Sequence, residues 1–262
     1  MAQWTVQDPQ RIQLDGAVVN VEVSLVRGRV SVVGAPGAAR IEVSAIGKRP
    51  IYVDEAGGRL RIRHNTRSHW PFYWWWFSRR YSCDLTVAVP TEASAQVNVV
   101  QGRVTVAGLL VDTDVDVTSG RVSLLGLAGR TRAKLVSGPV EALGVAGDLS
   151  METVSGSLTV AQSGADRVQA TTVSGAITCD VDSSTPAEIR LTTTSGEITI
   201  RVPAESDLDV RLATTSGKIT TAFPLETRDK HWSGSARGKL GTGSGTLTAT
   251  TTSGGIALLA SE

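Results

Sequence analysis

The sequence has few cysteines, few aromatic residues and almost no net charge. Its 262 residues include only Cys83 and Cys179, which excludes a disulfide framework and favours a reducing compartment. The 26 basic and 25 acidic side chains leave a net charge of +1, so the chain as a whole is not driven toward nucleic acid or an anionic membrane. No apolar run reaches the roughly 18–20 residues that cross a bilayer.

The opening, MAQWTVQDPQRIQLDG, has neither the basic start nor the apolar core of a secretory signal. We therefore expect a cytoplasmic protein, either free or peripheral at the inner face of the membrane.

Glycine, by contrast, is abundant, and much of it recurs at a fixed spacing. Ser-Gly dipeptides, and one Gln-Gly, follow one another at steps of 18 to 21 residues, with a last step of 37. A period near 20 residues is typical of a solenoid, in which each coil buries its apolar face against its neighbours. The glycines at this position are Gly102, Gly120, Gly138, Gly156, Gly175, Gly196, Gly217 and Gly254.

The residues around each glycine alternate in polarity. After Gly196, for example, Ile198 and Ile200 flank Thr199, and the other coils repeat the pattern. A period of two residues predicts half-buried strands, and no helical period is sustained. Glycine permits a turn conformation that other residues resist, so we predict that each Ser-Gly is a corner. The same phase turns one threonine column inward, where we expect bonds to the turn backbone or between threonines: Thr153, Thr172, Thr193, Thr214 and Thr251.

These patterns predict an all-β fold, a single-stranded right-handed β-helix or β-solenoid with coils of about 18–21 residues. Residues 1–100 are expected to form an N-terminal cap, a first coil and an aromatic insertion at about 65–82. Residues 101–262 are expected to form the remaining coils, with a loop excursion at about 222–245.

The aromatic insertion is the least ordinary stretch, because eight of the twelve aromatic residues fall between positions 70 and 81. Three interpretations stay open: a cap over an open solenoid end, a docking site for a protein partner, or a contact with a membrane surface or carbohydrate. The candidate partner-binding residues are Trp70, Phe72, Tyr73, Trp74, Trp75, Trp76, Phe77, Arg79 and Arg80.

Two further groups could carry chemistry. Arg29, Arg103 and Arg121 share one repeat position and would form an anion-binding column if their coils stack; solvated arginines are the alternative. Asp112, Asp114 and Asp116 could hold a hard cation or serve polysaccharide cleavage, and a solvated strand face is the alternative.

No metal site is expected, because His64 and His69 lack a third ligand at a suitable spacing, and no cofactor is expected either. Cys83 and Cys179 fall in phase with inward positions and are predicted to be small core residues.

The Ser-Gly coils, the opening WTVQDPQRIQLDG and the closing TTTSGGIALL together resemble adhesin-like proteins of the DUF4097 type, in particular actinobacterial members. That family is related to the toastrack β-strand repeats of bacterial envelope-stress proteins. The resemblance spans essentially the whole chain. It implies the repeat fold and supplies no catalytic residues.

The sequence therefore favours a non-catalytic interaction or scaffold protein that holds a partner through the aromatic insertion. A protein partner or self-association is expected, with a membrane surface or carbohydrate as alternatives and no nucleic acid. Two rival functions are a carbohydrate-active β-helix enzyme and a self-assembling structural protein, the latter because the last coil has little cover after it.

Overall fold

The computed structural model describes residues 2–14, 16–64, 81–182, 188–230 and 233–261. Within these ranges the secondary structure consists of β-strands and turns, without an α-helix. The chain divides into two compact units, Met1–Gly129 and Arg130–Glu262. The predicted all-β solenoid is confirmed.

In the first unit, long strands bend once and thereby form two arms of a coil. The strands β3, β8 and β9 run through both arms, and they are parallel and in register along each. The strands of this unit are β1 Ala2–Val6, β2 Gln10–Gln13, β3 Asn20–Gly34, β4 Arg40–Ile46, β5 Ile51–Ala56, β6 Arg59–His64, β7 Ser82–Val89, β8 Ser94–Ala107 and β9 Thr113–Leu125.

The first arms are ordered β1–β5–β6–β3–β8–β9, and the second arms β2–β4–β7–β3–β8–β9. Pairing is antiparallel from β1 to β6 and from β2 to β7, and parallel beyond. The first unit thus begins with short hairpin-like strands and continues as a solenoid.

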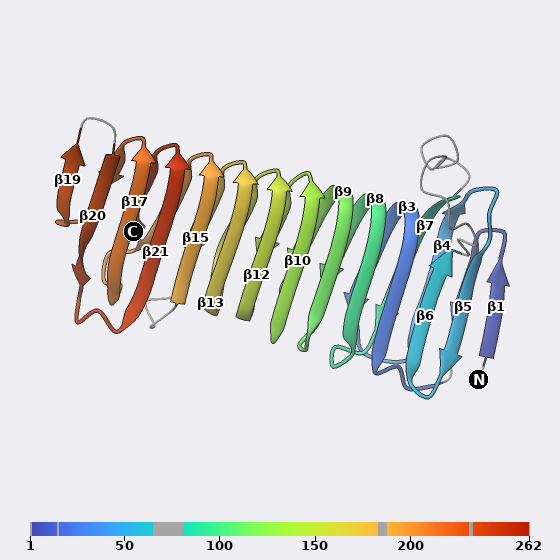
Figure 1. Cartoon of the computed structure of the whole chain (residues 1–262). Coiled ribbons are helices and arrows are strands. Elements are labelled where there is room, and N and C mark those ends of the chain that lie inside the picture. Colours follow the sequence, from blue (N-terminus) through green and yellow to red (C-terminus); the bar gives the residue numbers. More distant parts are fainter. Residues whose placement is uncertain (1, 15, 65–80, 183–187, 231–232, 262) are drawn as a thin grey trace. The chain divides into compact units, whose positions relative to one another are not determined.

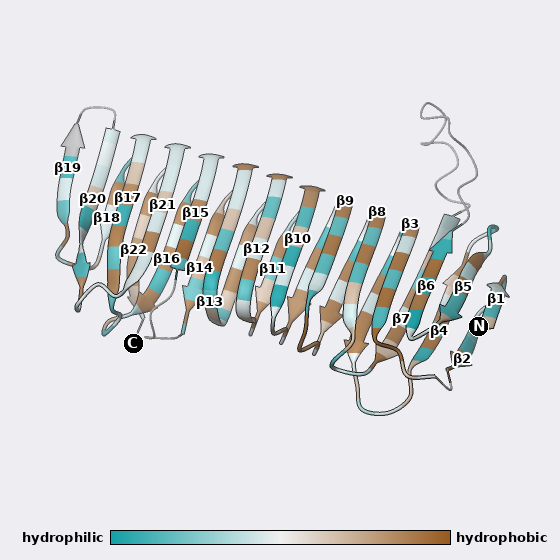
Figure 2. Cartoon of the chain, turned by 60° about the horizontal axis from the view of Figure 1, so that its bottom comes forward, coloured by the Kyte–Doolittle hydropathy of each residue, from teal (hydrophilic) through white to brown (hydrophobic). Residues whose placement is uncertain are grey.

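The bend between the arms shows in the burial pattern. On β9, Val115 and Val117 are buried before the corner, and Val122 and Leu124 after it, so the inward phase shifts by one residue at Ser119-Gly120. Figure 2 shows the resulting bands of hydrophobic and hydrophilic residues along β3, β8 and β9. The core lies between the two arms, and Leu109 and Leu127, in the turns that follow β8 and β9, are also buried.

The corner requires glycine because successive coils approach each other closely there. A Cβ placed on Gly102 would collide with the carbonyl oxygen of Gly28, and a Cβ on Gly120 with that of Gly102. The same collision recurs along the second unit. The predicted role of these glycines as corners is therefore confirmed, and the close backbone contact is a second reason for their presence.

The inward threonine column satisfies its hydroxyl groups at the same corner. In the second unit, Thr172 donates to the carbonyl oxygen of Gly156 (3.4 Å) and Thr193 to that of Gly175 (3.3 Å). Thr214 and Thr251 make equivalent bonds, while the Thr153 hydroxyl has no partner within the described residues. The predicted bonding to the turn backbone is confirmed for four of the five.

The second unit repeats the two-arm coil. Its strands are β10 Arg130–Ser137, β11 Val140–Leu143, β12 Ala146–Ser155, β13 Leu158–Ser174, β14 Ile177–Val181, β15 Glu188–Ser195, β16 Ile198–Pro203, β17 Leu208–Ser216, β18 Ile219–Thr221, β19 Glu226–Lys230, β20 Ser233–Leu240, β21 Gly245–Ser253 and β22 Ile256–Ser261.

The coils of this unit do not stack in chain order. The last coil, β21–β22, is inserted between the β15–β16 coil and the β17–β18 coil, and it pairs in parallel with both. Figure 1 shows β15, β21, β17, β20 and β19 side by side in that order. Thr251 accordingly bonds Gly196 (3.2 Å), and Thr214 bonds Gly254 (2.9 Å).

This order corrects two expectations from the sequence. Residues 222–245, predicted to be a loop excursion, contain β19 and β20, and β20 pairs antiparallel with β17. The last coil is not an uncovered end, so it gives no support to self-assembly through such an end. The strand at this end of the second unit is β19 rather than β21. Its sequence, ETRDK, is charged, as is common on edge strands that resist pairing with another chain.

The Asp207 carboxylate holds the connection between β20 and β21, which places the last coil between the two earlier ones. Residues 241–244 pass the start of β17, where both Leu240 and Gly245 pair with Leu208. The Asp207 carboxylate accepts bonds from the hydroxyl groups of Thr242 (2.7 Å) and Ser244 (2.8 Å) and from the backbone N–H of Gly243. These bonds hold the pKa of Asp207 well below its usual range.

Candidate functional site

The aromatic insertion begins and ends at a corner of the solenoid. In the adjacent strand β3, two residues separate Ser24 from Arg27. Their register partners in the next coil, Arg63 and Ser82, are separated by eighteen residues, 64–81. The chain therefore adds sixteen residues where its neighbour makes a simple corner.

The candidate residues within this insertion lie outside the described residues. They are Trp70, Phe72, Tyr73, Trp74, Trp75, Trp76, Phe77, Arg79 and Arg80. The structure does describe the two ends that carry them, His64 at the end of β6 and Tyr81 before β7.

These two ends contact each other. The rings of His64 and Tyr81 meet edge to face, with centroids 5.6 Å apart, and the Arg49 guanidinium lies 5.8 Å from the centroid of the Tyr81 ring. His64 is buried, and its Nδ1 accepts a bond from the backbone N–H of Val26 (3.3 Å). This anchor was not predicted from the sequence, although His64 and Tyr81 stand at the boundaries of the aromatic stretch.

Burial lowers the pKa of His64 to about 4. The neutral ring is thus favoured in the folded state, and its Nε2 has no hydrogen-bond partner within the described residues. Protonation would place an N–H on Nδ1, opposite the N–H of Val26, so it would also break the bond between them.

We predict that His64 makes the first unit less stable in acid. The pKa of His64 in the folded protein lies below the unfolded value of 6.5. The contribution of the neutral ring to the free energy of unfolding is therefore fully present above pH 6.5 and is lost as the pH falls toward 4. The difference between the folded and unfolded pKa values corresponds to roughly 3 kcal/mol of unfolding free energy. Thermal unfolding at several pH values should show that the Tm falls more steeply with decreasing pH for the wild type than for His64→Leu. Equal slopes would contradict the prediction.

The predicted arginine column has the stacking it requires. Arg29, Arg103 and Arg121 occupy successive register positions on β3, β8 and β9, and all three are exposed. The position before Arg29 in the row is Asp84 on β7, whose carboxylate accepts the backbone N–H of Arg29 (3.0 Å).

A second row of residues beside the arginines was not predicted from the sequence. Ser31, Thr105 and Ser123 follow the arginines by two residues, are also in register, and are half-buried. The repeated pattern Arg-Val-Ser or Arg-Val-Thr after the corner glycine is the signal that could have identified it.

The three aspartates lie at exposed positions of the first unit. Asp114 and Asp116 are exposed on β9, where they oppose Gln96 and Asn98 of β8, and Asp112 is exposed just before the strand. Within the described residues no group of three or more His, Cys, Asp or Glu side chains could hold a metal ion.

Both cysteines are core residues, as predicted. Cys83 and Cys179 are free and buried, and burial raises the pKa of each thiol to about 12, with smaller contributions from Asp84 and Asp180. Neither thiol is therefore a nucleophile at neutral pH.

Comparison with known proteins identifies the family. The family model of Toastrack DUF4097 matches residues 30–259. This chain belongs to the Toastrack DUF4097 family. The match covers both units and agrees with the resemblance carried by the Ser-Gly coils.

Solved structures with similarity to this Toastrack protein are distant relatives. A Bacteroides fragilis protein described as a "putative adhesin" is 14% identical, with 98% of each chain covered and a TM-score of 0.43. A Parabacteroides distasonis protein with the same description is 11% identical, with 96% of each chain covered and a TM-score of 0.38. A second protein of that species, described as a "putative lipid binding protein", is 10% identical, with 97% of each chain covered and a TM-score of 0.31.

No curated protein matched the chain. Among the described residues, no helix is long and apolar enough to cross a membrane.

Proposed function

We propose that this Toastrack protein is a non-catalytic, adhesin-like interaction scaffold that docks on a partner surface through its aromatic insertion. The observation that carries the proposal is the addition of sixteen residues at a corner where the adjacent strand needs two. The coils hold the two ends of the insertion at a corner between paired strands, and the insertion supplies the contact residues.

The place of attachment favours docking over capping. β6 and β7, which flank the insertion, lie two strands in from β1 and β2, the first strands of their sheets. Val6 on β1, Ile12 on β2 and the following Leu14 are buried, so the end of the first unit has a core of its own. A cap would have to reach past two strands to cover residues that are already buried.

The composition of the insertion supports contact with another molecule. Tryptophan and arginine dominate the energetics of protein interfaces, and the same pair suits anionic membrane surfaces. The insertion combines four tryptophans with Arg79 and Arg80. We further propose a cytoplasmic location, peripheral at the inner membrane face, which the two free buried cysteines support.

The test uses light scattering after size-exclusion chromatography, with and without vesicles of phosphatidylglycerol and phosphatidylcholine. We expect the variant with Trp74, Trp75 and Trp76 changed to Ser to remain folded and to lose self-association or vesicle binding by about tenfold or more. The matched control changes three exposed valines of the second unit to Ser: Val136, Val154 and Val173.

The control variant should behave like the wild type in every readout. Unfolding of the tryptophan variant would mean that the insertion is a structural cap. A folded tryptophan variant that keeps all wild-type associations would contradict docking through the insertion.

A further inference from the structure

The strand β1 has a neighbour on one side only. It pairs antiparallel with β5, and none of the other strands in the described ranges pairs with it. Figure 1 shows β1 at the end of its sheet, beside β5. The backbone N–H and C=O groups on its other side can therefore pair with an additional strand.

The sequence of β1 does not discourage such pairing. AQWTV contains neither a charge nor a proline. By contrast, the edge strand β2 has the sequence QRIQ and the edge strand β19 has the sequence ETRDK, so both carry the charges that commonly protect edges. Of these three edges, β1 is the one best suited to accept a strand.

The inward face of β1 is only partly covered by its own sheet. Trp4 and Val6 share this face, because their register partners, Val53 and Ile51, are both fully buried. Val6 is also fully buried, whereas Trp4 is half-buried. Apolar side chains on an additional strand would lie opposite Trp4 and Val6 and would remove the remaining indole surface from water.

Glu55 places a negative charge on the same inward face. It is the register partner of Ala2, and on its other side it pairs with Leu60, which is fully buried. Glu55 is half-buried, and its carboxylate forms no ion pair or hydrogen bond with a described residue. An additional strand beside Ala2 would remove this carboxylate further from water.

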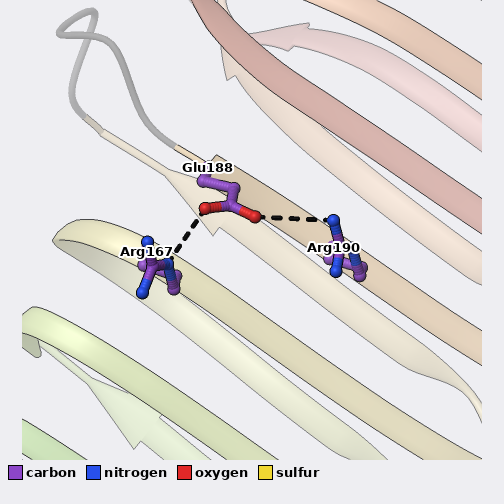
Figure 3. A network of polar contacts seen from close by, with 3 residues as sticks. All are labelled: Arg167, Glu188 and Arg190. Atoms are coloured by element: carbon purple, nitrogen blue, oxygen red, sulfur yellow. Dashed lines mark hydrogen bonds and ion pairs between the residues drawn. The ribbon is translucent and has the colours of Figure 1, made fainter.

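Carboxylates on the outward faces of strands are placed differently. Glu188, for example, lies between Arg167 (3.0 Å) and Arg190 (3.5 Å), as Figure 3 shows. An exposed carboxylate can also do without a cation, because water reaches it. A strand added beside Glu55 has to bring a cation or leave the carboxylate buried without a partner, which is costly. This requirement gives the edge a preference for basic segments.

The distance across the edge suits a long basic side chain. A residue opposite Ala2 would lie two strand spacings from Glu55, about 10 Å at the backbone. The small side chain of Ala2 lies between them, so a lysine or an arginine can extend over it to the carboxylate.

We propose that β1 binds an extended segment of a partner protein by antiparallel strand addition. The segment carries a lysine or an arginine opposite Ala2 and apolar residues opposite Trp4 and Val6. Antiparallel pairing continues the arrangement of this part of the unit, in which β1, β5 and β6 alternate in direction. The backbone groups supply the affinity, and the basic residue supplies the specificity.

This surface is separate from the docking surface proposed above. β1 lies two strands from β6, where the aromatic insertion begins, and the added strand contacts described residues. The tryptophan variant should therefore keep its affinity for a basic strand. The two proposals can fail independently.

The test measures binding of the labelled peptide SVTVTKS, with both ends blocked, to the full chain by fluorescence anisotropy. In antiparallel register its lysine faces Ala2, and its two valines face Trp4 and Val6. The peptide SVTVTES, with glutamate in place of lysine, should bind roughly tenfold more weakly. Glu55→Gln should remove this preference, whereas the control Asp54→Asn, on the outward face of the same strand, should keep it.

Two N-methylated forms of SVTVTKS test the pairing itself. N–H groups point alternately to the two sides of a strand, so either the two valines or the two threonines of the peptide donate to β1, and not both pairs. Methylation of one pair should weaken binding about tenfold or more, and methylation of the other pair should leave it unchanged.

Equal effects of the two methylations, no binding of SVTVTKS, or equal affinities for the lysine and glutamate peptides would overturn the proposal. Light scattering adds a further arm. A wild-type dimer that SVTVTKS dissociates would overturn the proposal in favour of a second copy of the chain on β1.

Discussion

Gly196→Ala is expected to destabilise the second unit by about 3 kcal/mol and to lower its Tm by roughly 10 °C. The added Cβ would meet the carbonyl oxygen of Gly175, which is backbone and cannot rotate away. To relieve the collision the coils must separate. Separation strains the bonds that cross this corner, including those from Gly175 N–H to Ser195 and from Thr193 to Gly175.

Gly164→Ala is the matched control for this prediction. Gly164 lies in the same unit, on β13, and a Cβ there would meet nothing within 4 Å. Thermal unfolding followed by circular dichroism compares the two variants, and the control should stay close to the wild type. Similar Tm values for both variants would contradict the close-contact explanation of the corner.

Leu258→Ala is expected to cost about 3 kcal/mol, the usual effect of emptying a fully buried leucine site. Leu258 lies on β22, which pairs with β16 on one side and β18 on the other. Its side chain is fully buried. A strand at the outer end of a stack would lose much less on the same change, because one side would already face water.

Leu259→Ala provides the comparison, since Leu259 is adjacent but points outward and is only half-buried. Denaturant unfolding should show a change of less than about 1 kcal/mol for this control. If both leucine variants lowered the free energy of unfolding by less than about 1 kcal/mol, β21–β22 would not be an interior coil.

The local structure of the coils could be predicted from the sequence because one physical pattern fixes it. Alternation of apolar and polar residues sets which side chains are buried, and Met151, Leu191 and Leu212 are all buried as their phase requires. The threonine column was predictable for the same reason. Its partners are the corner carbonyl groups, which occur in every coil.

The order of the coils could not be predicted, because the corners are chemically alike. Thr193, Thr214 and Thr251 each present the same hydroxyl to the same kind of glycine carbonyl, so no local pattern distinguishes one stacking order from another. The order is decided by non-local features. The hairpin β19–β20 occupies the far side of β17, and Asp207 holds the crossover that returns the chain.

The candidate site was predictable in part. The composition of the aromatic stretch and the repeat position of Arg29, Arg103 and Arg121 are visible in the sequence, and the register brings the arginines together as expected. The position of the insertion at about 65–82 was visible, but its replacement of a two-residue corner of β3 was not, because that depends on pairing between strands far apart in the chain. His64 and Tyr81 acquire their contact only through that pairing.

The most direct test of the docking scaffold replaces residues 64–81 with the two residues that β3 uses at the same register, Leu25 and Val26. Light scattering and vesicle co-sedimentation then compare the shortened chain with the wild type. We predict a folded protein whose coils close as their neighbours do, with a Tm near that of the wild type and with self-association and vesicle binding abolished. A shortened chain that unfolds, or that folds and associates like the wild type, would contradict the proposed function.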